Sequence, residues 1–189
     1  MNYSKNIMKL SLLFAILALL FMSGCYGVMQ TAEITPKKKF AHTVKIGSIS
    51  EIGDVIVPVD IGYRLRYGVN DKFEVSSGID LVFPRVYIGG KYGITDYFAI
   101  NTNLNLLTLG DEYEDNIFFN TDIAFILGTD LYGGVKVFLP NFSSGSLSIQ
   151  DYGIYPFIGK KMNLGKRIIL IPEVGLADEF VYFGIGLGF

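Results

Sequence analysis

Few residues of this 189-residue chain have the types and spacing that chemistry requires. His42 is the only histidine, and no cysteine or carboxylate cluster accompanies it in the sequence. A metal site or a nucleophile–base pair needs several such groups together. We therefore assign no catalytic residue, no metal ligand and no cofactor, and interpret the chain as a non-enzyme.

One acidic run could bind a cation. Four of the five residues from Asp111 to Asp115 are acidic, and carboxylate oxygens are ligands that divalent cations accept. The spacing matches no calcium loop, so a solvated acidic loop is the favoured interpretation.

Cys25 is the only cysteine, which excludes an internal disulfide. It follows a segment typical of an export signal, with Lys5 and Lys9 before an apolar stretch too short to span a membrane comfortably. Residues 22–25 (Met-Ser-Gly-Cys) resemble the bacterial lipobox, although Met22 replaces the usual leucine. The resemblance implies cleavage before Cys25 and acylation of Cys25. A plain secretory signal with an incidental cysteine is the alternative.

Residues 26–39 show no periodicity and end in Pro36 and three lysines. The lysines could contact anionic lipid headgroups, and a plain solvated linker is an equally good interpretation. The expected organisation is a signal peptide (1–24), a lipidated tether (25–39) and one barrel domain (40–189). Removing residues 1–24 leaves 14 basic and 18 acidic residues, a net charge of about −4, with no clustered basic face for nucleic acid.

The organisation of residues 40–189 follows from a hydrophobic period of two. Between Val55 and Val69, every second residue is apolar, while Asp60, Arg64 and Arg66 lie between them. Seven segments have an apolar face without a single charge, as a lipid-facing surface requires, because a charge at the bilayer centre costs roughly 2–4 kcal/mol. We predict an all-β fold, a closed antiparallel up-and-down transmembrane barrel of about ten strands, at 40–49, 54–69, 73–83, 85–94, 98–108, 116–127, 131–139, 152–161, 167–177 and 180–189.

The turns indicate how the barrel is oriented. Residues 67–73 (Tyr-Gly-Val-Asn-Asp-Lys-Phe) are echoed 25 residues later at 92–98, and resemble the Tyr-Gly-(Ile/Val)-Thr-Asp turns of many bacterial outer-membrane barrels. Such barrels have short periplasmic turns and longer outer loops, here 109–116 and 140–151. With ten strands, both termini are then expected in the periplasm.

The chain ends on an aromatic residue. Phe183, Ile185, Leu187 and Phe189 alternate with glycines and a tyrosine, resembling the C-terminal targeting strand that barrel-assembly machinery recognises. Together the leader, strands, turns and terminus resemble a generic small bacterial outer-membrane barrel of no particular named family. The implied partners are outer-membrane lipid and the barrel-assembly and lipoprotein-processing machineries; the sequence does not indicate an oligomeric state.

The inward face is expected to carry balanced charges. Five are basic and five acidic: Lys45, Arg64, Arg66, Lys91 and Lys136, with Asp60, Glu74, Asp80, Asp122 and Glu173. They could form a salt-bridged plug, which we favour for a narrow barrel, or line a polar path, for which the inward glycines leave space. A three-residue loop at 128–130 would set Asp122 directly opposite Lys136, predicting an ion pair between neighbouring strands.

These features favour a structural or interaction protein of the cell envelope. The alternative is a small-solute channel or a lipid-binding transport component. A lipid-modifying enzyme would need a nucleophile and a base at the rim, which the sequence does not offer. Omptin-type barrel proteases use acid and acid–histidine pairs at the extracellular rim, whereas His42 is expected at the periplasmic end.

Overall fold

The structure, a computed structural model, describes residues 28–51, 59–81, 85–111, 114–139, 141–143, 147–148, 153–165, 167–177 and 180–189. The predicted signal peptide and Cys25 lie outside these ranges, and the side chains of Asp60 and of the acidic run are not described. Within these ranges, no helix is long and apolar enough to cross a membrane.

Ten long strands form one closed antiparallel barrel. Each pairs with its neighbours in the chain, and the β1–β13 pairing joins the last strand to the first. The predicted fold class is thus confirmed. The strands are β1 (Phe40–Glu51), β2 (Val59–Gly68), β3 (Phe73–Asp80), β4 (Arg85–Thr95), β5 (Phe98–Asp111), β6 (Glu114–Leu127), β7 (Leu131–Phe138), β10 (Gly153–Lys160), β12 (Ile169–Ala177) and β13 (Phe180–Gly188).

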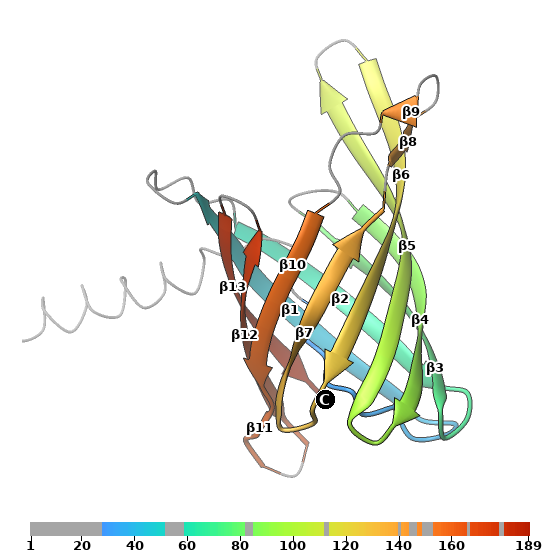
Figure 1. Cartoon of the computed structure of the whole chain (residues 1–189), viewed down its shortest axis with the longest axis vertical. Helices are drawn as coiled ribbons and strands as arrows, with labels where there is room; N and C mark the ends of the chain where they lie inside the picture. The colour runs from blue at the N-terminus through green and yellow to red at the C-terminus, as the bar shows by residue number, and fades with distance from the viewer. Residues whose placement is uncertain are drawn as a thin grey trace, which may run out of the picture.

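The two ends of the barrel differ. At one end, short turns join β2 to β3, β4 to β5 and β6 to β7, and the C-terminus lies there too (Figure 1). We call this end the short-turn rim; the two-residue strand β11 (Met162–Asn163) also lies here, paired with β12. At the other end the β5–β6 hairpin extends beyond the remaining strands, with β8 (Asn141–Ser143) paired to β6 and β9 (Leu147–Ser148) paired to β8.

The two faces of the wall are opposite in polarity. Outward side chains are large, apolar and exposed, such as Ile88 at 64% and Phe183 at 58%. Inward side chains on the same strands are buried and largely polar or small, such as Lys91 on β4 and Glu173 on β12. Closure leaves no unpaired strand edge, so this arrangement suits a lipid environment on the outside.

The β6–β7 turn corrects one prediction. Leu127 faces Gly133, not Leu131, because Leu131 and Tyr132 pair with β10 only. Gly128 begins this longer turn at a φ of +94°, a backbone region that favours glycine. The predicted register is therefore wrong by two residues. A shift of two keeps every side chain on its face, so Asp122 and Lys136 still point inward.

The N-terminal residues correct another prediction. Residues 28–35, which we call the lumen segment, lie inside the barrel: Val28, Met29, Gln30 and Ala32 are almost completely buried. The expected solvated linker is therefore wrong for these residues, although the lysines at 37–39 are exposed. Inward glycines provide the space, because a Cβ on Gly184 would lie only 1.8 Å from the end of the Met29 side chain.

Candidate functional site in the barrel lumen

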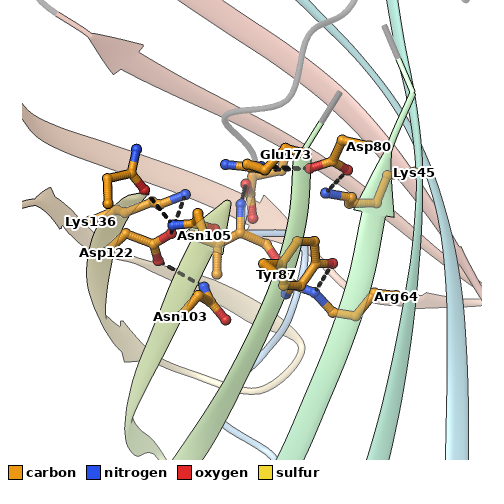
Figure 2. A network of polar contacts seen from close by, with 12 residues as sticks. Lys45, Arg64, Asp80, Tyr87, Asn103, Asn105, Asp122, Lys136 and Glu173 are labelled. Carbon is orange, nitrogen blue, oxygen red and sulfur yellow. Dashed lines mark hydrogen bonds and ion pairs between the residues drawn. The ribbon is translucent and has the colours of Figure 1, made fainter. Parts of the chain in front are cut away.

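A group of ion pairs lies in the half of the lumen away from the short-turn rim. We call it the salt-bridge layer; its members, from five strands, are Lys45, Asp80, Arg85, Asp122 and Lys136. Figure 2 labels all of them except Arg85. Lys45 Nζ lies 2.7 Å from one oxygen of Asp80, and Arg85 Nε donates to the other at 2.9 Å. Asp80 is fully buried between the two cations, so each of its oxygens meets a positive charge.

Asp122 and Lys136 form the other pair of this layer. Lys136 Nζ lies 3.5 Å from Asp122 Oδ2, although the paired residues in the sheet are Asp122 with Phe138 and Ala124 with Lys136. The two charged residues are therefore offset by two positions along the strands, a distance that the long lysine side chain spans. Asn103 donates to one carboxylate oxygen at 2.8 Å and Asn105 to the other at 2.9 Å. The charge of Asp122 thus has three partners.

Tyr87 links the salt-bridge layer to the lumen below it. Its ring faces three cations, with centroid distances of 5.4 Å for Lys45, 5.0 Å for Arg64 and 5.6 Å for Arg85. Its hydroxyl accepts a hydrogen bond of 2.8 Å from Arg64 Nε. The negative face of an aromatic ring attracts cations, so Tyr87 holds these long side chains together across the lumen.

Glu173 binds the start of the lumen segment. Its two oxygens accept four hydrogen bonds of 2.6–2.7 Å: from the backbone N–H groups of Val28 and Met29, and from the hydroxyls of Tyr132 and Tyr182. Met29 has a φ of +43°, which helps two successive N–H groups point at one anion. The carboxylate is buried, yet every bond it accepts is charge-assisted.

Other lumen side chains hold the remaining main chain of the segment. Arg64 donates to the carbonyl of Val28 at 2.9 Å, and Lys91 donates to the carbonyls of Thr31, at 3.1 Å, and Glu33. Glu74 accepts from the N–H of Thr35 at 2.6 Å and pairs with Lys91 at 3.2 Å. The backbone carbonyl of Gly128 accepts from Ala32 at 2.9 Å.

The segment leaves the lumen at the β2–β3 turn. Lys38 N–H donates to the carbonyl of Gly68 at 2.7 Å, and Gly68 N–H donates to the carbonyl of Lys39 at 3.1 Å. A Cβ on Gly68 would lie 2.2 Å from the carbonyl oxygen of Thr35 and 2.3 Å from that of Pro36. Only glycine permits this close approach of two backbones.

Most of the predicted lumen charges take part in these contacts. Arg66 contacts Thr43 Oγ1 at 3.4 Å, and its neighbours Glu74 and Lys91 hold the segment. The sequence reasoning missed Arg85, although its spacing from Tyr87 and Lys91 places it on the inward face. It also missed the lumen segment, whose residues carry no inward-facing pattern.

His42 lies on the outer side of the short-turn rim, as its spacing predicts. Its Nδ1 is 2.6 Å from the Tyr63 hydroxyl, and its ring stacks on Phe189 with a centroid distance of 5.4 Å. Backbone hydrogen bonds of 3.0 and 3.1 Å join His42 to Phe189 in both directions. In the part of the chain that the structure describes, no group of three His, Cys, Asp or Glu side chains could hold a metal ion, at His42 or at any other position.

The closed barrel, its apolar exterior and its polar interior define a transmembrane β-barrel of the outer-membrane type. The chain is similar to two solved structures of Ail, the attachment invasion locus protein of Yersinia pestis, one of them in complex with the heparin analogue sucrose octasulfate. Both are 12% identical over 79% of this chain and 93% of Ail, with TM-scores of 0.28 and 0.27. No protein-family model and no curated protein matches the sequence. The class therefore rests on the barrel itself.

Proposed function

We propose that this protein is a non-enzymatic outer-membrane barrel with a structural or interaction role in the cell envelope. The observation that carries the proposal is the double filling of its lumen. The lumen segment occupies the half nearer the short-turn rim, and the salt-bridge layer lies in the half beyond it. We infer that a barrel filled in this way offers no continuous aqueous path, which favours a role for its surfaces.

The proposal includes the orientation and the anchoring of the protein. The short turns and the C-terminus share one rim, and residues 36–39 reach the same rim at Gly68. Placing this rim in the periplasm follows the usual arrangement of such barrels. In this orientation the terminal strand, with Phe183, Ile185, Leu187 and Phe189, would serve the barrel-assembly machinery, and Cys25 would be acylated by the lipoprotein-processing machinery.

The experiment that tests the closed lumen is conductance in a planar bilayer. Purified full-length protein should give little or no steady current. Gel electrophoresis checks that the protein is folded, because the folded barrel migrates differently from the same sample after heating. A large, steady pore in the folded protein would contradict the proposal and favour the channel.

A small-solute channel remains the second candidate, and one observation favours it. The lumen segment belongs to none of the barrel strands, and the polar contacts that hold residues 28–32 to the barrel are made through main-chain atoms. Such a segment could leave without breaking the sheet. The two candidates predict different results when the segment is released: solute should then pass through a channel, but not through a structural barrel.

A further inference from the structure

We propose that the lumen next to the short-turn rim is a binding site for the main chain of a short, non-helical peptide, and that residues 28–35 are its resident ligand. The site would also accept a segment of another polypeptide that enters at this rim. The inference rests on the barrel fold and holds whether or not the barrel conducts.

The first support is the kind of atom that is recognised. The barrel contacts three carbonyls, of Val28, Thr31 and Glu33, through Arg64 and Lys91. It contacts four N–H groups, of Val28, Met29, Ala32 and Thr35, through Glu173, Gly128 and Glu74. Main-chain groups are common to all peptides, so these contacts select a peptide and not a particular sequence.

The second support is a buried side chain to which the barrel offers no hydrogen-bond partner. Gln30 is 1% exposed, yet neither of its amide atoms has a hydrogen-bond partner among the residues that the structure describes. A site adapted to this sequence would satisfy a buried amide. Glu33 is the exception: its carboxylate pairs with Lys161 at the rim, where it is partly exposed.

The third support is a steric requirement at one position. Ala32 is buried in the same apolar cluster as Ala99, Ala124 and Ile126, beside the β6–β7 turn. Ala32 is 1% exposed and shares this cluster with the small residues Ala99 on β5 and Ala124 on β6, so we expect a larger side chain at this position to clash. The preferred ligand is therefore a peptide of about eight residues with a small fifth side chain.

An exchange experiment tests the proposal. A protease site placed at the exposed lysines 37–39 allows the folded, full-length barrel to be cut, so that the lumen segment becomes a separate peptide. A fluorescent peptide with the sequence of residues 28–35 should then bind the cut barrel. It should bind the uncut barrel at least about 100-fold more weakly, because a tethered competitor acts at millimolar effective concentration.

Peptide variants identify what is recognised. With the N-terminus of the peptide acetylated throughout, methylating the backbone nitrogens of Val28 and Met29 removes both donors to Glu173 and should weaken binding at least tenfold. Replacing Gln30 by alanine in the peptide should change binding less than about twofold, and Ala32→Phe should abolish it. Equal binding of the N-methylated and unmodified peptides would overturn the proposal.

Two further outcomes are decisive. If the cut segment leaves the barrel, as seen by mass spectrometry, and the labelled peptide does not replace it, the proposal fails. If the cut segment stays bound, its release is compared between the wild type and Glu173→Gln. Release at the same rate would mean that the main-chain contacts contribute nothing, which also overturns the proposal.

Discussion

At the scale of single residues, the buried charges of the lumen depend on one another. Among the residues that the structure describes, Asp122 pairs with the cation Lys136 and accepts from two asparagines, and both members of the ion pair are almost fully buried. Removing one member of a buried pair leaves the other charge in a medium that solvates it poorly. The energetic consequence therefore differs between removing one charge and removing both.

Lys136→Ala should accordingly destabilise the barrel by roughly 3 kcal/mol. Adding Asp122→Ala should recover part of this loss, because no charge is then stranded. The measurement is denaturant unfolding in detergent micelles, with exposed Lys160→Ala as the matched control. Additive losses in the double variant would show that the two charges are not coupled.

Glu173 gives a second prediction at this scale. In Glu173→Gln, an N–H₂ group replaces one of the two oxygens that accept four hydrogen bonds, and it cannot accept from any of the four donors. Because hydrogen bonds to a charged group contribute about 2 kcal/mol each, the lumen segment should be released more readily.

Protease cleavage within residues 28–35 of the folded protein measures this release. Cleavage should be faster in Glu173→Gln than in the wild type. Lys160→Ala, which contacts no part of the segment in any interaction described above, should behave like the wild type. Unchanged protection in Glu173→Gln would show that the carboxylate does not hold the segment.

At the scale of elements, the last strand depends on its terminal residue. The backbone of Phe189 exchanges two hydrogen bonds with His42 on β1, and its ring stacks on the His42 ring. These contacts lie where the last strand meets the first and the barrel closes.

Deleting Phe189 should therefore reduce severalfold the amount of heat-modifiable barrel in the membrane. Phe183→Ala, which removes an equally outward aromatic ring from the middle of β13, is the control and should have a smaller effect. If the truncated chain accumulated to normal levels, the terminal aromatic would not serve assembly.

The sequence predicts the strands well because lipid and lumen impose opposite polarities on alternate residues. The period of two therefore identifies Ile88 as outward and Lys91 as inward. It does not fix the β6–β7 register, because a shift of two residues, which sets Leu127 opposite Gly133, leaves the same residues on each face.

The lumen segment could not be predicted for a different reason. Its contacts use N–H and carbonyl groups, which every residue other than proline provides, so Val28 and Thr31 carry no signature of their partners. The inward glycines, such as Gly184 on β13, indicate only that the lumen has space to fill.

At the scale of the whole molecule, two layers from different parts of the chain fill the lumen, and Arg64 contacts both, through Tyr87 and through the carbonyl of Val28. The salt-bridge layer comes from strand residues, whereas the lumen segment comes from the chain before β1. Displacing the segment should nevertheless leave the salt-bridge layer in place, because its ion pairs join strand residues to one another.

Gly68→Ala should displace the segment, because the added Cβ overlaps the backbone of Thr35 and Pro36. Gly188→Ala is the matched control, since its Cβ would meet only ordinary contacts of 3.5 Å or more. In planar bilayers Gly68→Ala alone should conduct little. Combined with Asp122→Ala and Lys136→Ala, which shorten two side chains of the other layer, it should conduct clearly. A conducting Gly68→Ala single variant would show that the salt-bridge layer does not close the lumen.

The depth at which Val28 is held also limits how far the chain before it can extend. Glu173 lies four residues along β12 from Ile169 at the short-turn rim, about 13 Å along the strand and about 10 Å along the axis of a barrel with the usual strand tilt. Cys25 precedes Val28 by three residues, which span at most about 10 Å. Only a fully extended chain would therefore bring Cys25 to the level of the rim, and its acyl chain would still have to turn around the wall to enter the periplasmic leaflet. We expect membrane anchoring through Cys25 to oppose a seated lumen segment.

If Cys25 is acylated, the cell should then contain two forms of the same barrel, one anchored and open to protease at residues 28–35, the other unanchored and protected. A fatty-acid analogue should label the first form only, and Cys25→Ser should lose the label and become uniformly protected. Equal labelling of Cys25→Ser would contradict acylation at this residue. Labelled protein with a protected segment would contradict this opposition, because the anchor would then reach the bilayer while the segment stays seated.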